Sequence, residues 1–150
     1  MTHEEAATLI GEHFVGAQVQ GGSPLAVTVP VDRWVALARF AKETLGCRFF
    51  AFSTAVDWKD GGLEVIAKVD NLDNQLSVLM KTRLGTGVSA CPSLVPVYRG
   101  ANWMERECYD MFGIRFEGHP DLRRILLADD WQGHPLLKSY AVDTPHPPYR

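Results

Sequence analysis

The chain has 150 residues, of which 46% are hydrophobic and 22% charged, and its formal net charge is −3. These values predict one globular domain with a single core. A slightly acidic balance argues against nucleic-acid binding and against attachment to an anionic membrane, because both require a surplus of Lys and Arg. No apolar run approaches the roughly 20 residues that cross a bilayer. The N-terminus lacks the order of a signal peptide, and the three cysteines are unclustered, so we expect a cytoplasmic protein with free thiols.

The N-terminal region predicts a helix followed by two short strands. Thr2 and Glu5 have the spacing of a capping box, which starts a helix, and apolar residues follow at helical intervals. The Gly- and Pro-containing run 21–24 predicts a turn. The strands on either side of it are expected at about 17–20 and 25–29.

A second helix is predicted to begin near Val31 and to end at Gly46, which suits a left-handed C-terminal cap. Its apolar face would consist of Trp34, Leu37, Ala38, Ala41 and Leu45. This stripe is typical of a helix that packs on a sheet.

Three longer strands are predicted after the second helix. Residues 47–56 are apolar on both faces, which is typical of a central strand that is covered on both sides. Residues 63–69 alternate between apolar and polar side chains, and the turn at 60–62 precedes them. Residues 75–83 form the last strand, with an inward apolar row.

The element order α-β-β-α-β-β-β contains no repeated βαβ unit. It predicts an α+β fold, with a mixed sheet of about five strands and helices on one face. Residues 1–98 would form this core. Residues 99–150 would add a helix and an irregular tail that is packed as part of the same domain.

The second part of the chain begins with a Gly/Pro loop at 84–92 and a short helical piece at 93–98. A longer helix is expected over 101–112, ending at Gly113. The following residues contain several prolines and predict a mostly extended tail. The tail also carries apolar side chains, so it should be covered by its own domain or by a neighbour; these are Ile125, Leu126, Leu127, Trp131, Leu136 and Leu137.

Two patterns resemble cofactor sites, but neighbouring residues argue against a site in both cases. The run from Gly85 to Ala90 has the spacing GxGxxA of a dinucleotide site, but Pro92 disfavours the helix that such a site needs. His119, His134 and His146 precede prolines, and no CxxC or HxxxH spacing accompanies them. We therefore expect these histidines to shape turns and to bond to backbone atoms.

Three acidic residues of the 101–112 helix are candidates for acid–base chemistry. Glu105 and Glu107 lie about 200° apart on a helix and cannot face one site together. Glu107 and Asp110 are neighbours, with Arg106 and the arginines at 123 and 124 as counter-charges. An ion-pair network that holds the helix to the tail is the favoured interpretation.

Arg106 is expected to reach across a protein interface, because it lies on the helix face away from Met104 and Met111. Cys108 is expected to be a small buried apolar residue and not a nucleophile. Aromatic residues that could anchor an interface, or pack in the core, are Trp103, Tyr109 and Trp131.

The run from Ala101 to Leu126 closely resembles the signature of the 30-kDa subunit family of respiratory complex I, the NADH-quinone oxidoreductase of bacteria. It contains Asn102-Trp103, Glu105-Arg106-Glu107, Tyr109 to Ile114 and Gly118 to Leu126. The continuation from Trp131 to Tyr140 fits as well.

This resemblance implies a non-catalytic subunit of the peripheral arm, on the cytoplasmic side of the inner membrane, that is attached to the membrane only through the complex. NADH, FMN, iron–sulfur clusters and quinone would be bound by partner subunits, with none of them in this chain. The implied partners are the 49-kDa-type subunit and the subunit that carries the last iron–sulfur cluster.

We predict that residues 101–140 form the docking surface. The residues assigned to this partner interface are Asn102, Trp103, Glu105, Arg106, Glu107, Tyr109, Asp110, His119, Pro120, Arg123, Arg124, Trp131, His134, Lys138 and Tyr140.

The chain departs from the family pattern at Leu137, where arginine is usual, and at Ser139, where an acidic residue is common. A local ion pair is therefore not expected there, and the end at residue 150 lacks the extension that some members carry. Two alternatives remain open. One is the equivalent subunit of a group 4 [NiFe] hydrogenase or a formate hydrogenlyase. The other is a free-standing enzyme that uses Glu107, Asp110 and Arg106.

Overall fold

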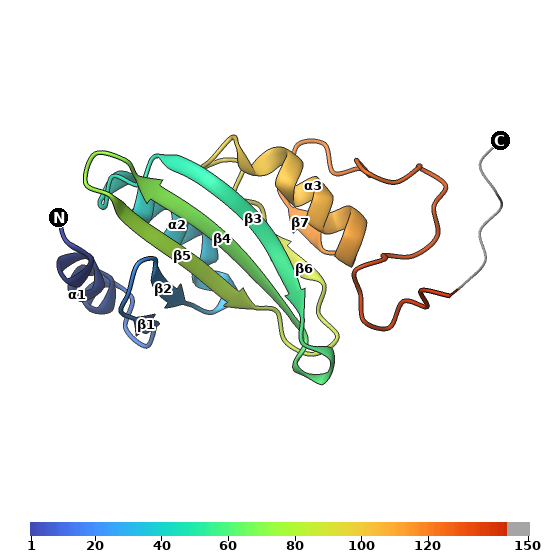
Figure 1. Ribbon diagram of the computed structural model, residues 1–150, viewed down its shortest axis with the longest axis horizontal. Coiled ribbons are helices and arrows are strands. Elements are labelled where there is room, and N and C mark those ends of the chain that lie inside the picture. Colours follow the sequence, from blue (N-terminus) through green and yellow to red (C-terminus); the bar gives the residue numbers. More distant parts are fainter. Residues whose placement is uncertain (144–150) are drawn as a thin grey trace.

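A computed structural model describes residues 1–143 and shows a long twisted sheet with helix α2 (Trp34–Glu43) across one face (Figure 1). The five strands lie in the order β1-β2-β5-β4-β3, and only β2 and β5 run parallel. The α+β fold with a mixed five-stranded sheet is therefore confirmed. The strands are β1 (Gln18–Gln20), β2 (Leu25–Thr28), β3 (Phe49–Asp57), β4 (Leu63–Asn71) and β5 (Leu76–Arg83). The prolines at 145, 147 and 148, and His146, lie outside the described residues.

Helix α1 (His3–His13) begins with the predicted capping box. The backbone N–H of Glu5 donates to the Thr2 hydroxyl at 3.2 Å, and the Glu5 carboxylate accepts from the Thr2 N–H at 2.8 Å. The helix buries Ala6 and Ile10 and lies near β1 at one end of the sheet (Figure 1). No helix within residues 1–143 is both long and apolar enough to cross a membrane.

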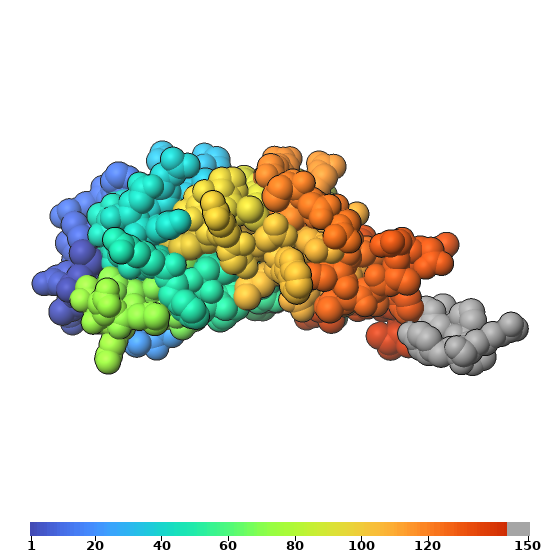
Figure 2. Space-filling view, turned by 90° about the horizontal axis from the view of Figure 1, so that it is seen from above, coloured from blue at the N-terminus to red at the C-terminus, as the bar shows by residue number. Residues whose placement is uncertain are grey.

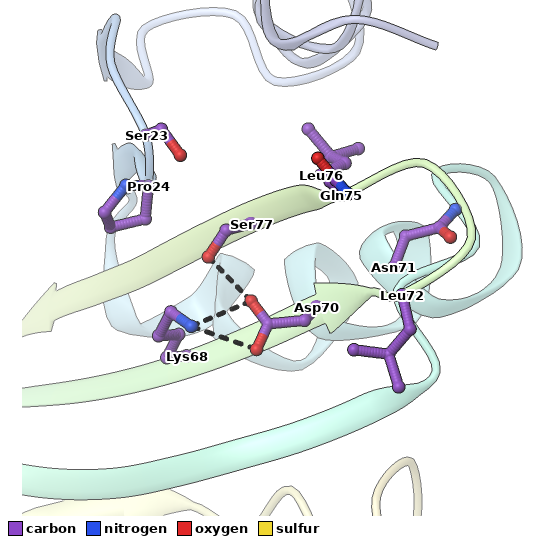
Figure 3. Close-up of a pocket in the computed structure, with 9 residues that line it drawn as sticks. All are labelled: Ser23, Pro24, Lys68, Asp70, Asn71, Leu72, Gln75, Leu76 and Ser77. Atoms are coloured by element: carbon purple, nitrogen blue, oxygen red, sulfur yellow. Dashed lines mark hydrogen bonds and ion pairs between the residues drawn. The ribbon is translucent and has the colours of Figure 1, made fainter.

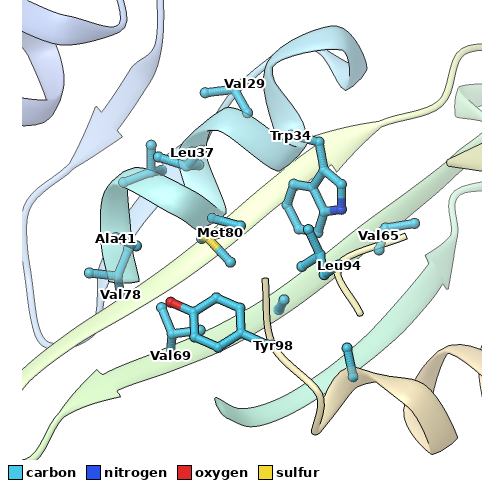
Figure 4. Close-up of a cluster of buried hydrophobic side chains, with 14 of the residues drawn as sticks. Val29, Trp34, Leu37, Ala41, Val65, Val69, Val78, Met80, Leu94 and Tyr98 are labelled. Atoms are coloured by element: carbon cyan, nitrogen blue, oxygen red, sulfur yellow. The ribbon is translucent and has the colours of Figure 1, made fainter. Parts of the chain in front are cut away.

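The main core lies between α2 and the sheet. A short 3-10 turn (Val31–Arg33) leads into α2, and Gly46 after it has a positive φ of 69°. The predicted apolar stripe of this helix is buried, and Figure 4 shows Trp34, Leu37 and Ala41 facing Val69, Val78 and Met80 of the strands. The inward rows of β4 and β5 are as the alternation predicts.

Strand β3 was predicted to be central, and this is wrong. It is an edge strand, and the Phe49 side chain is 50% exposed. Helix α3 (Ala101–Phe112) packs against β3, whereas Phe52 of this strand is also exposed. The Ser53 backbone N–H donates to the Met104 sulfur at 3.2 Å, and Phe50 packs on Tyr98 with ring centroids 5.2 Å apart.

A second, two-stranded sheet was not predicted. Strand β6 (Ala90–Pro92) pairs in parallel with β7 (Arg115–Glu117), which joins the segment before α3 to the segment after it. Because Ala90 enters a strand, no helix opens on the GxGxxA run, as expected. The short helix predicted at 93–98 is only a turn, in which the Tyr98 N–H donates to the Leu94 carbonyl at 2.7 Å.

The sheet face opposite α2 carries polar residues near the β4–β5 turn. Asp70 accepts from Lys68 at 3.0 Å and from the Ser77 hydroxyl at 2.6 Å (Figure 3). Ser23 and Pro24 also line this pocket of about 400 Å³. Because the charged groups here satisfy one another, they form a local network and not an open ligand site.

Candidate docking segment around helix α3

Helix α3 packs by one face on the domain and ends at a glycine that its sequence provides. Ala101, Cys108 and Phe112 are buried on its inner face. Cys108 is thus the buried apolar residue that was predicted. Gly113 ends the helix in the left-handed conformation with φ 72°. A Cβ atom at Gly113 would lie 2.7 Å from the His134 ring, so this position needs glycine both for its backbone and for the close approach of the tail.

Asp110 is the centre of the contact between α3 and the tail. Its side chain is fully buried, and its Oδ2 atom accepts the backbone N–H groups of residues 125, 126 and 127 at 3.2, 2.8 and 2.9 Å. Its Oδ1 atom pairs with Arg124 at 2.6 Å. One carboxylate therefore satisfies three consecutive backbone donors and one guanidinium.

The environment of Asp110 favours its charged form. Burial raises the pKa of the carboxyl, but the hydrogen bonds from Arg124 and from the three backbone N–H groups outweigh burial, so the pKa of Asp110 lies below its ordinary value. Arg124 also donates to the carbonyls of Trp131 and Gly133 at 2.9 and 3.0 Å. The pair thus holds both the near and the far parts of the tail. This confirms the predicted ion-pair network between helix and tail, although Glu107 is exposed and takes no part in it.

Arg106 does not reach outward, so that prediction is wrong. Its side chain is buried, with 6% exposure, and it donates from Nε to the Arg123 carbonyl at 3.1 Å and from Nη2 to the Arg124 carbonyl at 2.9 Å. The tail crosses the helix face that the sequence leaves polar. The arginine therefore satisfies carbonyl groups of its own chain.

The two histidines in the described part of the tail bond to backbone atoms, as expected. His119 accepts the Asp121 N–H at Nδ1 and lies 3.0 Å from the Asn102 carbonyl at Nε2, so Nε2 carries the proton. His134 donates from Nδ1 to the Asp110 carbonyl at 2.9 Å. Within residues 1–143, no three His, Cys, Asp or Glu side chains come together as a metal site would require.

Glu105 is also buried, but it contacts the loop before α3 and not the tail. Its carboxylate accepts from the Ser93 hydroxyl and from the Leu94 N–H, both at 2.6 Å. Burial raises the pKa of Glu105 to about 7, against the opposing effect of these two hydrogen bonds. Burial also raises the pKa of the nearby Cys91 and Cys108 thiols, which are therefore poor nucleophiles.

Three large apolar side chains of this region are exposed among charged residues. Trp103 is 70% exposed on α3, and Leu126 and Leu136 of the tail are 60% and 54% exposed. The Leu136 N–H donates to the Met111 carbonyl at 3.0 Å. The tail is therefore held in place while Leu126 and Leu136 face solvent. We name Trp103, Leu126 and Leu136 the apolar docking patch.

The other predicted interface residues divide into two groups. Asn102, Tyr109, Trp131 and Tyr140 are half-buried, and the Tyr109 ring lies 6.3 Å from that of His134. The exposed residues are Glu107, Pro120, Arg123 and Lys138. Leu137, at the position where the family usually has arginine, packs against the core.

Two residues that bind α3 or the tail were not predicted from the sequence. Ser93 binds Glu105, and Asp57 accepts the Lys138 N–H at 2.8 Å across 81 positions of the chain. The Lys138 and Lys59 N–H groups lower the pKa of Asp57. The available signals were a serine before a turn and an aspartate at the end of a strand, but neither identifies a partner so distant in sequence.

The structure does not bring Glu107, Asp110 and Arg106 to one site. Arg106 and Asp110 are buried and bind the tail, whereas Glu107 faces solvent. No group of these residues could share a substrate. The acid–base centre considered from the sequence is therefore not formed.

Comparison with known proteins decides the family. The family described as "Respiratory-chain NADH dehydrogenase, 30 Kd subunit" matches residues 27–146. The chain belongs to this family. It is also 40% identical to the corresponding NADH-quinone oxidoreductase subunit of Chloroherpeton thalassium over 147 residues, which cover 93% of this chain and 61% of that protein. For the equivalent subunit of Geotalea uraniireducens, identity is 39% over 83% of this chain and 77% of that protein.

Two solved structures share the fold of this 30-kDa-type subunit. A trypsin-resistant fragment of Nqo5 matches with a TM-score of 0.67 and 24% identity, over 81% of this chain and all of the fragment. A chain of the membrane-bound sulfane sulfur reductase, an archaeal respiratory membrane complex, matches with a TM-score of 0.71 and 28% identity, over 85% of this chain and 77% of that chain. As a member of the 30-kDa subunit family, the chain is a subunit of a complex I-type assembly.

Proposed function

We propose that this chain is a non-catalytic subunit of the peripheral arm of a respiratory NADH:quinone oxidoreductase, on the cytoplasmic side of the inner membrane. It would scaffold the 49-kDa-type subunit at the junction between the quinone cavity and the last iron–sulfur cluster. In this proposal NADH, FMN, the clusters and quinone are bound by partner subunits, and the chain contributes a docking surface to the electron-transfer and ion-translocating complex.

The proposal rests on one observation about residues 101–140, which we name the signature segment: its buried charged side chains and its exposed apolar side chains have different roles. Its charged side chains, above all Asp110, Arg124 and Arg106, are used within the chain to hold the tail. The apolar docking patch then faces outward on a backbone that is already positioned. A surface that is ordered before binding loses less conformational entropy when the partner arrives.

A second candidate is the equivalent subunit of a related membrane-bound complex, of the group 4 [NiFe] hydrogenase or formate hydrogenlyase type. The observation that favours it is the match to a chain of the archaeal sulfane sulfur reductase complex. The same docking surface would serve in such a complex, with a different electron donor.

Purification of the tagged chain from its native membranes separates these functions. Recovery with flavin- and cluster-bearing subunits, together with NADH-dependent quinone reduction, would support the first. Recovery with a nickel subunit and hydrogen-dependent activity would support the second. If the chain is recovered without any partner subunit, both proposals are wrong.

The docking patch is tested in the same preparation. Leu126→Asp/Leu136→Asp should reduce recovery of partner subunits at least tenfold, because obligate interfaces are typically apolar and bury upwards of about 2,000 Å². Val15→Asp/Leu72→Asp is the matched control, since both of these residues are exposed and lie outside the signature segment. Equal recovery of partners by the two double variants would contradict the assigned surface.

A further inference from the structure

A second surface lies outside the signature segment, where the beginning of β3 meets the loop before α3. It is a groove of about 720 Å³, and its principal side chains are Lys42, Arg48, Phe49, Phe50, Tyr98 and Arg99. Residues from two distant parts of the chain adjoin here, and the cyan and yellow atoms that meet in Figure 2 are these parts. The groove is separate from the apolar docking patch.

The charge of the groove is opposite to that of the whole chain. Lys42, Arg48 and Arg99 line it, and no Asp or Glu does, although the chain has a net charge of −3. Arg48 and Arg99 are exposed, and neither forms an ion pair with any residue in the range 1–143. Two guanidinium groups without a counter-ion favour a ligand that carries carboxylate or phosphate oxygens.

The floor of the groove is held rigidly. The Tyr98 hydroxyl donates to the Cys47 carbonyl at 2.7 Å, and its ring packs on Phe50. Lys42 donates to the Val97 carbonyl, and its Nζ lies 5.3 Å from the centre of the Tyr98 ring. The exposed ring of Phe49 adds an apolar wall. The groove therefore offers two arginines and an aromatic surface in a fixed arrangement.

We propose that this groove binds an acidic segment of a partner subunit, with carboxylates on Arg48 and Arg99 and an apolar side chain against Phe49. It would be a second contact within the assembly, independent of the docking patch. A protein segment is favoured over a membrane surface for a physical reason. Electrostatic membrane sites present clusters of about four to eight Lys and Arg residues, whereas three cations line a concave groove here.

Carbodiimide cross-linking of the assembled complex tests the contact directly, because this reagent joins a lysine amine to a carboxylate only when the two touch. Arg48→Lys/Arg99→Lys keeps the charge and adds reactive amines. We expect cross-links from position 48 or 99 to Asp or Glu of another subunit. The control Arg33→Lys/Arg39→Lys places amines at exposed positions outside the groove and should give none.

Charge reversal gives an independent readout. Arg48→Glu/Arg99→Glu should lower the amount of chain retained in the complex about tenfold at physiological salt, with a smaller difference at high salt, where the attraction in the unmodified chain is screened. Arg33→Glu/Arg39→Glu, which changes the net charge equally, should be retained like the unmodified chain.

The outcomes also separate this proposal from the proposed function. Recovery of the unmodified chain with its partners tests the function alone. A complex that assembles but gives no cross-link from position 48 or 99 to another subunit overturns the groove proposal. Binding of the purified chain to phosphatidylglycerol vesicles, lost in Arg48→Glu/Arg99→Glu and accompanied by no such cross-link, would assign the groove to a lipid and would also overturn it.

Discussion

Helices α2 and α3 are similar in length but are held by different interactions. Helix α2 is fixed by an apolar stripe, including Trp34 and Leu37, that packs on the inward rows of the sheet (Figure 4). Helix α3 is covered on its second side by a tail that has no regular structure between β7 and residue 143, and Asp110, Arg124 and Arg106 hold that tail through backbone groups.

The difference has a consequence for stability. Apolar packing spreads its stabilisation over many contacts, so a single truncation in the core weakens the whole domain. The tail depends on a few buried polar groups, and the loss of one leaves several others without partners. Substitutions in the tail network should therefore detach the tail without unfolding the sheet.

The largest effect is expected for Asp110→Ala. This change leaves the Arg124 guanidinium and three backbone N–H groups without their acceptor, and the loss of one partner from such a buried pair costs about 3–5 kcal/mol. Trypsin should cleave after Arg123, Arg124 and Lys138 much faster than in the unmodified chain. Leu37→Ala, with a similar expected loss of about 2–5 kcal/mol, is the control: it should lower the global midpoint and show no preference for cleavage in the tail. Equal cleavage patterns in the two variants would show that the tail and the core are not stabilised separately.

Glu105→Gln tests the buried carboxyl through pH. Burial holds the pKa of Glu105 at about 7, above its ordinary 4.5, so the folded chain keeps a proton that the unfolded chain has lost. The resulting stabilisation is complete below the unfolded pKa and is lost as pH rises through 7. A neutral glutamine removes this loss, so the variant should be more stable than the unmodified chain at pH 8, by up to about 3 kcal/mol, and about equal at pH 4.

The midpoint of thermal unfolding at several pH values gives the measurement. Glu107→Gln is the matched control, since Glu107 is exposed on the same helix, and it should leave the pH profile unchanged. If Glu105→Gln lowers stability by the same amount at both pH values, the carboxylate is charged in the folded protein and the assignment fails.

Arg106→Gln should have a smaller effect than Asp110→Ala. It removes hydrogen bonds to two tail carbonyls, at Arg123 and Arg124, and a charged donor of this kind contributes about 1–3 kcal/mol. Faster amide exchange should be confined to residues near 123–127. If instead assembly with partners is lost while the tail remains protected, Arg106 acts across the interface after all.

The smallest effect is expected for Asp57→Ala at the far end of the tail. It removes the acceptor for the Lys138 N–H, so exchange of that amide should rise several-fold while the midpoint of global unfolding stays the same. A fall in the global midpoint would show that this contact belongs to the core and not to the tail.

Elements with a periodic row of apolar residues were predicted correctly from the sequence. Predictions were less accurate for the elements that lack such a row. The predictions of the capping box, the apolar face of α2 and the inward rows of β4 and β5 were correct. In these helices and strands the spacing of the residues identifies the cap or the face that is buried. The pattern over 47–56 did not reveal an edge strand, because helix α3 packs against β3 and an apolar run does not show whether its neighbour is a helix or a strand. Strands β6 and β7 have three residues each, which is too short for an alternating pattern.

The contacts of the buried polar residues between α3 and the tail could be predicted only in part. A connection between the helix and the tail could be predicted from opposite charges, and Asp110 with Arg124 confirmed it. The direction of Arg106 could not be predicted, since its partners are carbonyl groups, which every residue carries. For the same reason no pattern in the sequence indicates that Asp110 binds the backbone at 125–127.

We expect Asp110 to hold the tail on α3 before any partner binds. Amide hydrogen exchange of the purified, unassembled chain tests it most directly, at the N–H groups of Ile125, Leu126 and Leu127 that donate to the Asp110 carboxylate. We expect exchange slowed at least a hundredfold relative to an unstructured chain, and loss of this protection in Asp110→Ala. Exchange at the unstructured rate in the unmodified chain would show that the tail is ordered only by its partners, and would contradict the account.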